Sequence, residues 1–517
     1  MKWYENAVFY HIYPLGLCGC AHENNGEQQS KFDKIKRWAN HAKDLDFTAI
    51  YIGPLFESQT HGYDTTDYKT VDKRLGTNED FKDFVKFCHE IGLKVIVDGV
   101  FNHVGRDFFA FRDLKQNREN SRYRDWFCNV NFWGNNEYND GFSYDNWGGY
   151  NLLVKLNHHN GEVRDYLLDC VKFWIDEFDI DGIRLDAADV LDHGFMQALR
   201  SFTTPLKSDF WLMGEVIHGN YSMWANDQKL HSVTNYELHK ALYSGHNDHN
   251  YFEIAHNVKR MIDNCRNIKL YTFVDNHDVS RIASKLNNKA HLSPVSILLY
   301  TLPGVPSVYY GSEFGVLGDK QRGDDWNLRP DLILDDFKSN ELAQFIKLLG
   351  RAKKELPELS LGEYKELLLT NRQYAFARMM NGSAVITAVN NDDIPVTVDI
   401  RVPMNVDKAY DVLDSFKNNG EKSVETEPEK VDLTPFSNVA ESAKSLFDAI
   451  CEISDEDSAG KIADMIKAVQ TKYDDAMKQV WNKAPAVDFA EGSKIEVCGG
   501  NLKVTIPANS GTIIKVM

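Results

Sequence analysis

The feature that most limits the fold is a regular alternation of short apolar runs with helical segments over the first 355 residues. Such alternation is typical of parallel α/β sheets, where a helix follows each strand. One run, KVIVDGV (94–100), is apolar throughout, as expected for a strand buried on both faces. Eight strand-like runs occur: VFYHIYP (8–14), TAIYIGP (48–54), KVIVDGV, GIRLD (182–186), WLMGE (211–215), HSVTNYE (231–237), YTFVD (271–275) and SVYYG (307–311). Eight strands with crossover helices, such as those expected at 33–46 and 79–92, predict a (β/α)8 TIM barrel.

Two segments depart from this rhythm. Residues 104–160 are rich in Asn, Asp, Gly, Tyr and Trp, and so long a connection indicates a functional excursion domain after the third strand. From residue 361 to 517 the apolar residues alternate with period two, which predicts a C-terminal antiparallel β-sandwich. Helical spacing at 436–482 predicts a helical hairpin inserted into it. The barrel then comprises residues 1–103 and 161–360.

The charge and the apolar segments exclude several classes of protein. With 58 Lys and Arg against 76 Asp and Glu, the net charge is −18, so we expect no nucleic-acid partner and favour a neutral or cationic small substrate. The longest apolar segment, 295–310, contains Pro303 and Pro306 and is too short to span a bilayer. The start MKWYENAVFY lacks a signal-peptide pattern and the eight cysteines are scattered, so we expect a cytoplasmic protein.

Polar side chains follow the predicted strands where a parallel barrel carries its functional groups, at the carboxyl ends. Four strand ends together supply Asp98, Asn102, His103, Arg184, Asp186, Asp189, Glu215, Asp275, His277 and Asp278. Carboxylates that lie close together at one end of a barrel raise each other's pKa, because their negative charges repel. This repulsion destabilises the fold, so such a cluster indicates a function. Paired carboxylates with separated pKa values are the basis of glycoside hydrolysis.

Eight motifs occur in order along the first 360 residues: YHIYP (10–14), GYDTTDY (62–68), DGVFNH (98–103), KLNHHN (155–160), GIRLDAADV (182–190), GEV (214–216), FVDNHD (273–278) and GVPSVYYG (304–311). This ordered set resembles glycoside hydrolase family 13, the α-amylase family, over residues 1–360. Within that family, the motif LVKLN (153–157) is similar to that of the neopullulanase and cyclomaltodextrinase group. The resemblance implies a glycosidase with the barrel fold expected above.

The resemblance also implies catalytic roles. Asp186 matches the nucleophile, Glu215 the general acid/base, and Asp278 the third carboxylate, which binds sugar hydroxyls. The implied reaction is a double displacement with retention: Glu215 protonates the glycosidic oxygen while Asp186 attacks the anomeric carbon, and water then resolves the glycosyl-enzyme.

Four further residues match substrate-binding positions of the family. Arg184 would orient Asp186 and keep it ionised by charge pairing, while Asp98 supports Arg184. Tyr63 would stack on the sugar ring. His103 and His277 would form hydrogen bonds with the sugar at the cleavage subsite.

Two positions bear on metal and subsite use. Many α-amylases carry Lys-His after the nucleophile segment, where this chain has Asp189 and Val190. The chemistry requires no cofactor. Asn102 matches a common calcium ligand, so a structural calcium ion is compatible with the sequence, although the sequence identifies no set of metal ligands.

The expected activity is therefore that of a retaining α-glucan hydrolase, acting on α-1,4 bonds of maltodextrins, cyclodextrins or starch fragments. A glucanotransferase, a trehalose synthase and an oligo-1,6-glucosidase share the three carboxylates and stay open as alternatives. The intact carboxylates disfavour a non-catalytic glycan-binding protein. In the segment 318–329, Asp319 and Arg322 are candidates for binding outer sugars. The sequence does not indicate an oligomeric state.

Overall fold

The computed structural model describes residues 2–265, 268–418, 492–498 and 500–516, together with residues 466, 468, 469 and 472. Eight parallel strands form one sheet in the order β11-β10-β9-β5-β2-β1-β13-β12. A parallel bridge between Thr234 and Tyr271 joins the two ends of this order, so the sheet closes into the predicted barrel. The strands are β1 (Phe9–Ile12), β2 (Ala49–Ile52), β5 (Lys94–Gly99), β9 (Gly182–Leu185), β10 (Trp211–Gly214), β11 (Ser232–Val233), β12 (Tyr271–Phe273) and β13 (Val305–Tyr309).

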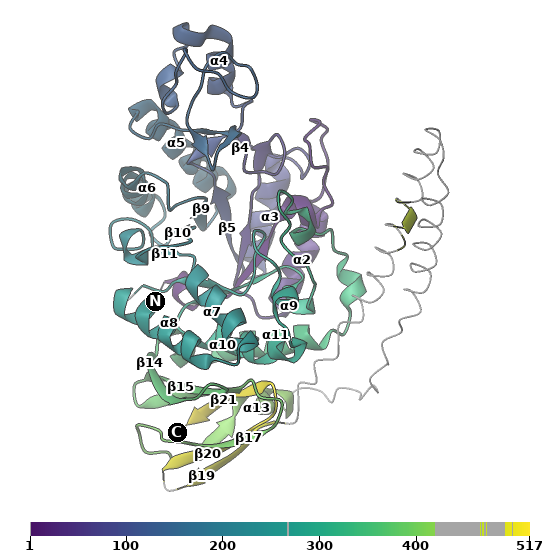
Figure 1. The fold of residues 1–517 in the computed structure, drawn as a ribbon, viewed down its shortest axis with the longest axis vertical. Helices are drawn as coiled ribbons and strands as arrows, with labels where there is room; N and C mark the ends of the chain where they lie inside the picture. Colours follow the sequence, from purple (N-terminus) through teal and green to yellow (C-terminus); the bar gives the residue numbers. More distant parts are fainter. Residues whose placement is uncertain are drawn as a thin grey trace, which may run out of the picture.

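Helices cover the outside of this barrel (Figure 1). Each is amphipathic or wholly apolar where it faces the strands; α10, for example, is buried along its whole length. The helices of the barrel are α1 (Pro14–Leu17), α2 (Phe32–Asp44), α3 (Asn78–Glu90), α5 (Gly161–Phe178), α6 (His193–Leu206), α7 (Tyr236–Asn247), α8 (Tyr251–Asn264), α9 (Ile282–Lys285), α10 (Leu292–Thr301), α11 (Glu341–Glu355) and α12 (Glu358–Leu361). None of the helices within the described ranges is long and apolar enough to cross a membrane.

Large side chains fill the interior of the barrel. The rings of Phe9 and Trp211 stack with their centroids 5.0 Å apart, and Tyr271 packs edge-on against Phe9. This layer is contributed by strands that are far apart in the sequence, as is usual for a barrel interior. The barrel is therefore a packed core, and its polar groups lie at the strand ends.

The sixth strand is shorter than the run HSVTNYE predicts. Strand β11 ends at Val233, and Tyr236 already begins α7. The reason is local: the Asn235 side chain accepts a hydrogen bond from the Leu238 backbone N–H, which caps the helix. This start of α7 places Tyr236 close to Glu215, as described below.

The long connection after β5 carries its own small sheet. Its strands are antiparallel in the order β6-β8-β7, formed by β6 (His103–Val104), β7 (Asn146–Trp147) and β8 (Tyr150–Lys155), and α4 (Phe109–Asn117) packs beside it. A separate hairpin of β3 (Phe56–Ser58) and β4 (Thr65–Val71) follows β2. Both additions emerge from the carboxyl ends of barrel strands, at the end of the molecule away from the C-terminal sheets (Figure 1).

The C-terminal part contains two antiparallel sheets, as predicted. One has the order β14-β15-β16-β21-β18 and the other β17-β20-β19. Apolar residues from both sheets, such as Ile386 and Val504, form a common core. The elements are β14 (Glu363–Leu369), β15 (Gln373–Met380), β16 (Ser383–Asn390), β17 (Val396–Ile400), β18 (Ala409–Asp411), α13 (Val412–Asn418), β19 (Lys494–Cys498), β20 (Asn501–Ile506) and β21 (Ser510–Val516). The predicted helical hairpin at 436–482 lies outside the described residues, apart from four isolated positions.

Buried neutral histidines make the fold sensitive to acid. Burial lowers the pKa of His103 and His246 to about 3, and that of His158 and His239 to about 4. The unfolded chain therefore binds protons below pH 6.5 that the folded chain does not bind. We expect the free energy of unfolding to fall between pH 7 and pH 5, by up to about 1.4 kcal/mol per pH unit for each such histidine.

Urea unfolding at several pH values measures this slope. The variant His246→Gln, which keeps a donor for the Leu242 carbonyl, should show a shallower slope than the wild type. The exposed His256→Gln on α8 serves as the matched control and should leave the slope unchanged. A free energy of unfolding that stays constant between pH 7 and pH 5 would contradict the prediction.

Candidate active site

The structure brings all seven predicted site residues together at the carboxyl end of the barrel. Three lie in or directly after β9 and β10, and the others come from β6, the β3–β4 connection and the segment after β12. A chain of side-chain contacts of 4 Å or less connects them through Asp98 and Arg184. The seven are Tyr63, His103, Arg184, Asp186, Glu215, His277 and Asp278.

A single guanidinium lies at the centre of this cluster. Arg184 is 3% exposed, and its Nη1 atom lies 2.8 Å from Asp98 Oδ1 and 3.0 Å from Asp186 Oδ1. Its Nη2 atom lies 2.9 Å from Glu215 Oε2. The contact of Asp98 with Arg184 agrees with the supporting role expected for Asp98. Three carboxylates thus share one positive charge in a buried place.

The excess of negative charge around Arg184 affects the pKa of Asp186, the candidate nucleophile. Burial raises the pKa of Asp186 well above its usual value; Arg184 lowers it, but Glu215 raises it further. The guanidinium of Arg184 is divided among three carboxylates, so its charge only partly offsets the effect of burial on the pKa of Asp186.

Asp278 lies in a different electrostatic environment. Its Oδ1 atom is 3.0 Å from Arg329 Nη2, and its Oδ2 atom is 2.9 Å from His277 Nε2. Burial raises the pKa of Asp278, but the contacts with His277 and Arg329 outweigh it and hold the pKa below its usual value. Asp278 is therefore an ionised carboxylate whose side chain is still 29% exposed, and it can accept hydrogen bonds from a ligand.

Aromatic and imidazole rings form the walls beside these carboxylates. The hydroxyl of Tyr63 bonds to Asp98 and to His277, and its ring stacks on His277 with centroids 5.5 Å apart. His103 Nε2 lies 3.9 Å from Asp186 Oδ2, and the ring of Trp147 lies 5.9 Å from the ring of His103. Burial keeps His103 neutral, so it can act as a hydrogen-bond donor without adding charge.

Sequence reasoning missed two residues of the site. Tyr236 donates a hydrogen bond to Glu215 Oε1 over 3.1 Å, and Asn276 in turn donates to the Tyr236 hydroxyl. Tyr236 was hidden in a run interpreted as a strand. Arg329 ends the segment 318–329, from which the sequence favoured other residues; it also donates to the His277 carbonyl. Two sequence signals could have indicated these residues: Tyr236 follows shortly after the end of β11, and Arg329 is the last residue of a polar loop.

The candidates for outer-sugar binding are on the surface. Asp319 and Arg322 are both exposed in the loop after β13, and their role stays a prediction. Asp189 is also exposed, and its backbone N–H donates to the Glu215 carbonyl over 3.2 Å. Partial burial of its carboxyl and the nearby Glu215 charge raise the pKa of Asp189.

The Asn102 side chain was the one indication of calcium. Its Oδ1 atom is buried and has no hydrogen-bond partner among the described residues. Within the same described ranges, however, no group of three or more His, Cys, Asp and Glu side chains is arranged to hold a metal ion. Calcium also binds amide and backbone carbonyl oxygens, so a structural calcium ion at Asn102 stays a prediction.

Tyr236 provides a test of how this site is positioned. Tyr236→Phe removes the donor to Glu215 without changing the volume of the ring, so kcat should fall by about tenfold. The alkaline limb of the pH profile of kcat/KM should also move to higher pH, because the donor favours the ionised carboxylate. Tyr243→Phe on the same helix is the control. A pH profile identical to that of the wild type would show that Tyr236 does not act on Glu215.

Comparisons with known proteins agree with this geometry. The model of the alpha amylase catalytic domain matches residues 23–352. A cyclomaltodextrinase from Thermoanaerobacter pseudethanolicus is 31% identical over 75% of this chain and 71% of its own length. An intracellular maltogenic amylase from Bacillus subtilis is 29% identical over 80% of this chain and 73% of its own length. The chain spans only 64% of a maltogenic alpha-amylase from Bacillus acidopullulyticus, at 30% identity.

Solved structures show the same fold. A cyclomaltodextrinase superposes with a TM-score of 0.71 at 27% identity, covering 79% of this chain and 73% of that chain. A debranching enzyme from Nostoc punctiforme superposes with a TM-score of 0.73 at 24% identity, covering 99% of this chain and 98% of that chain. The second likeness concerns the fold alone.

Proposed function

The chain belongs to the α-amylase family of glycoside hydrolases, and from this premise we propose that it is a retaining hydrolase of α-1,4 bonds in maltodextrins, cyclodextrins and starch fragments. The observation that carries the proposal is the placement of Asp186 and Glu215 on the two Nη atoms of Arg184, at 3.0 and 2.9 Å. A guanidinium is compact, so the two carboxylates lie on neighbouring nitrogens. Retaining enzymes need closely spaced carboxylates, whereas inverting enzymes need a wider gap that admits water.

The first step requires a proton on Glu215 and an ionised Asp186. Glu215 gives this proton to the glycosidic oxygen as the bond from that oxygen to the anomeric carbon breaks. Asp186 attacks the same carbon and forms the glycosyl-enzyme ester. As Glu215 becomes negative, Arg184 and the Tyr236 hydroxyl stabilise its charge.

The second step reverses the proton transfer. Glu215 takes a proton from a water molecule, whose oxygen attacks the anomeric carbon, and the bond to Asp186 breaks. Arg184 then contacts the released Asp186 carboxylate again. Two inversions leave the anomeric configuration unchanged.

The remaining residues bind the sugar. Asp278, ionised beside Arg329, accepts hydrogen bonds from ring hydroxyls, and His103 donates to the same glucosyl unit. The developing positive charge on the sugar ring is stabilised by the negative surplus around Arg184. Trp147 and Tyr150, exposed by 38% and 63%, offer apolar ring faces on the side of His103.

The substrate class and the location rest on the relatives. The proteins named cyclomaltodextrinase and maltogenic amylase are about equally similar to this chain, so the proposal covers both kinds of α-glucan. A cytoplasmic location is part of the proposal, supported by the Bacillus subtilis relative that is named intracellular.

The proposal is tested by proton NMR of the anomeric signals during reaction with maltoheptaose. The wild type should release the α-anomer first, and Glu215→Gln should lower kcat by about 10²–10⁴-fold because the proton donor is lost. Glu237→Gln, a neighbouring carboxylate paired with Arg260, is the matched control and should keep full activity. Early release of the β-anomer would contradict the double displacement.

Product lengths in the same experiment separate the alternatives. A hydrolase gives only chains shorter than maltoheptaose, whereas a glucanotransferase also gives longer chains. Activity on isomaltose without activity on maltoheptaose would identify an oligo-1,6-glucosidase, and conversion of maltose to trehalose would identify a trehalose synthase.

A further inference from the structure

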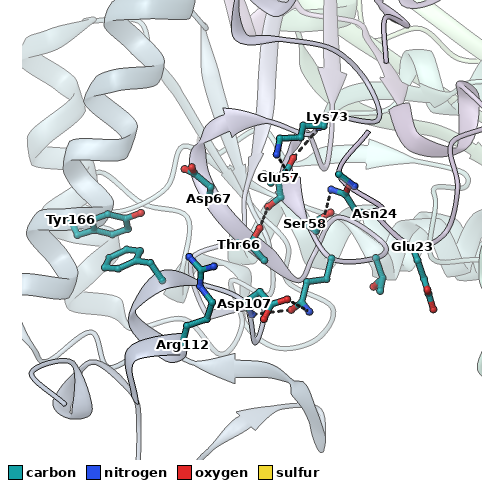
Figure 2. Close-up of a pocket in the computed structure, with 14 residues that line it drawn as sticks. Glu23, Asn24, Glu57, Ser58, Thr66, Asp67, Lys73, Asp107, Arg112 and Tyr166 are labelled. Carbon is teal, nitrogen blue, oxygen red and sulfur yellow. Dashed lines mark hydrogen bonds and ion pairs between the residues drawn. The ribbon is translucent and has the colours of Figure 1, made fainter. Parts of the chain in front are cut away.

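A hollow of about 770 Å³ lies beside the active site and shares none of the seven predicted site residues. Three parts of the chain form it: residues 23–26, the β3–β4 hairpin, and the start of α4 with the facing side of α5. Figure 2 shows side chains from all three parts converging on it. Its volume lies within the range of small-ligand sites, about 300–1,000 Å³.

The lining chemistry narrows the class of ligand. The hollow has four carboxylates against two cations, so anionic ligands are repelled. One wall consists of the rings of Phe109 and Tyr166, whose centroids are 5.5 Å apart. The rest is polar, and it offers both donors and acceptors. A ligand with many hydroxyl groups and an apolar ring face fits such a lining, whereas a purely apolar ligand does not.

Two charged side chains of the hollow are free to meet a ligand. Arg112 and Glu23 form no side-chain hydrogen bond or ion pair with any residue that the structure describes, although most other polar groups of the lining are paired with each other. Figure 2 shows the Arg112 guanidinium projecting into the hollow, between Tyr166 and Thr66. The hollow therefore offers a hydrogen-bond donor, the Arg112 guanidinium, and an acceptor, the Glu23 carboxylate, on different sides.

We propose that this hollow is a second α-glucan-binding site, which holds a neutral segment of a long chain away from the catalytic carboxylates. Arg112 donates to sugar hydroxyls, the Glu23 carboxylate accepts from them, and the Phe109–Tyr166 wall covers a ring face. The ligand class rests on the proposed function. A second contact raises the effective concentration of a tethered chain at the active site, so the benefit grows with chain length.

The floor of the hollow is joined to the active-site loop. Gln59 and Asp107 bond to each other twice, at 2.9 and 3.1 Å, and Thr60 donates to Asp64 over 2.9 Å. Asp64 is the neighbour of Tyr63, whose hydroxyl contacts Asp98. A chain bound in the hollow therefore lies against the same loop that forms one wall of the active site.

Binding is measured by calorimetry with maltoheptaose and the Glu215→Gln enzyme, in which slow turnover keeps most of the ligand intact during the titration. Two binding events per chain are expected. Adding Arg112→Ala should weaken one event by about tenfold or more, as expected for loss of hydrogen bonds to a charged donor. Adding Arg122→Ala, an exposed arginine of the same segment outside the hollow, should change neither event.

Kinetics with the otherwise unchanged enzyme give the second readout. In Arg112→Ala, KM for soluble starch should rise several-fold while kcat and KM for maltotriose stay those of the wild type. A single binding event that Arg112→Ala leaves unchanged, or equal starch kinetics in the Arg112 and Arg122 variants, would overturn the second site. Neither result bears on the proposed hydrolysis, which is tested separately by cleavage of maltoheptaose and by the anomer that the wild type releases first.

Discussion

The site depends on one buried guanidinium that three carboxylates share. Moving a charge out of water costs several kcal/mol, and Arg184 regains this only through its close contacts with Asp98, Asp186 and Glu215. Strand pairing makes these contacts inevitable: Asp98 on β5 is in register with Arg184 on β9, and Glu215 directly follows β10, the other neighbour of β9. Removing Arg184 would leave three adjacent carboxylates uncompensated.

The positions of the cations give Asp186 and Asp278 different electrostatic environments. Around Arg184 there is more negative than positive charge, and this surplus together with burial raises the pKa of Asp186. Around Asp278, Arg329 and His277 compensate the charge, and the carboxylate stays ionised for binding. The fold thus produces two carboxyl environments of opposite character at one end of a barrel, which is what acid–base chemistry on a sugar requires.

The barrel, the C-terminal sheets and the gathering of the seven candidate residues at one end of the barrel could be predicted because strand periodicity and motif order are local properties of the sequence. The role of Tyr236 could not be predicted, because the Asn235 cap starts α7 inside a run with strand-like alternation. The contact of Arg329 with Asp278 could not be predicted either, because only the folded loop brings Arg329, rather than Arg322, to that carboxylate. The raised pKa of Asp186 depends on how three carboxylates divide one guanidinium, which spacing alone does not reveal.

The central claim is that Asp186, held by Arg184, forms the covalent bond to the sugar. Trapping with a 5-fluoro-α-glucosyl fluoride, followed by proteolysis and mass spectrometry, tests it most directly, because the fluorine slows the second step and the glycosyl-enzyme accumulates. The account predicts one glycosyl adduct per chain, located on Asp186. An adduct on another carboxylate, or turnover of the reagent without any adduct and with inversion at the anomeric carbon, would contradict it.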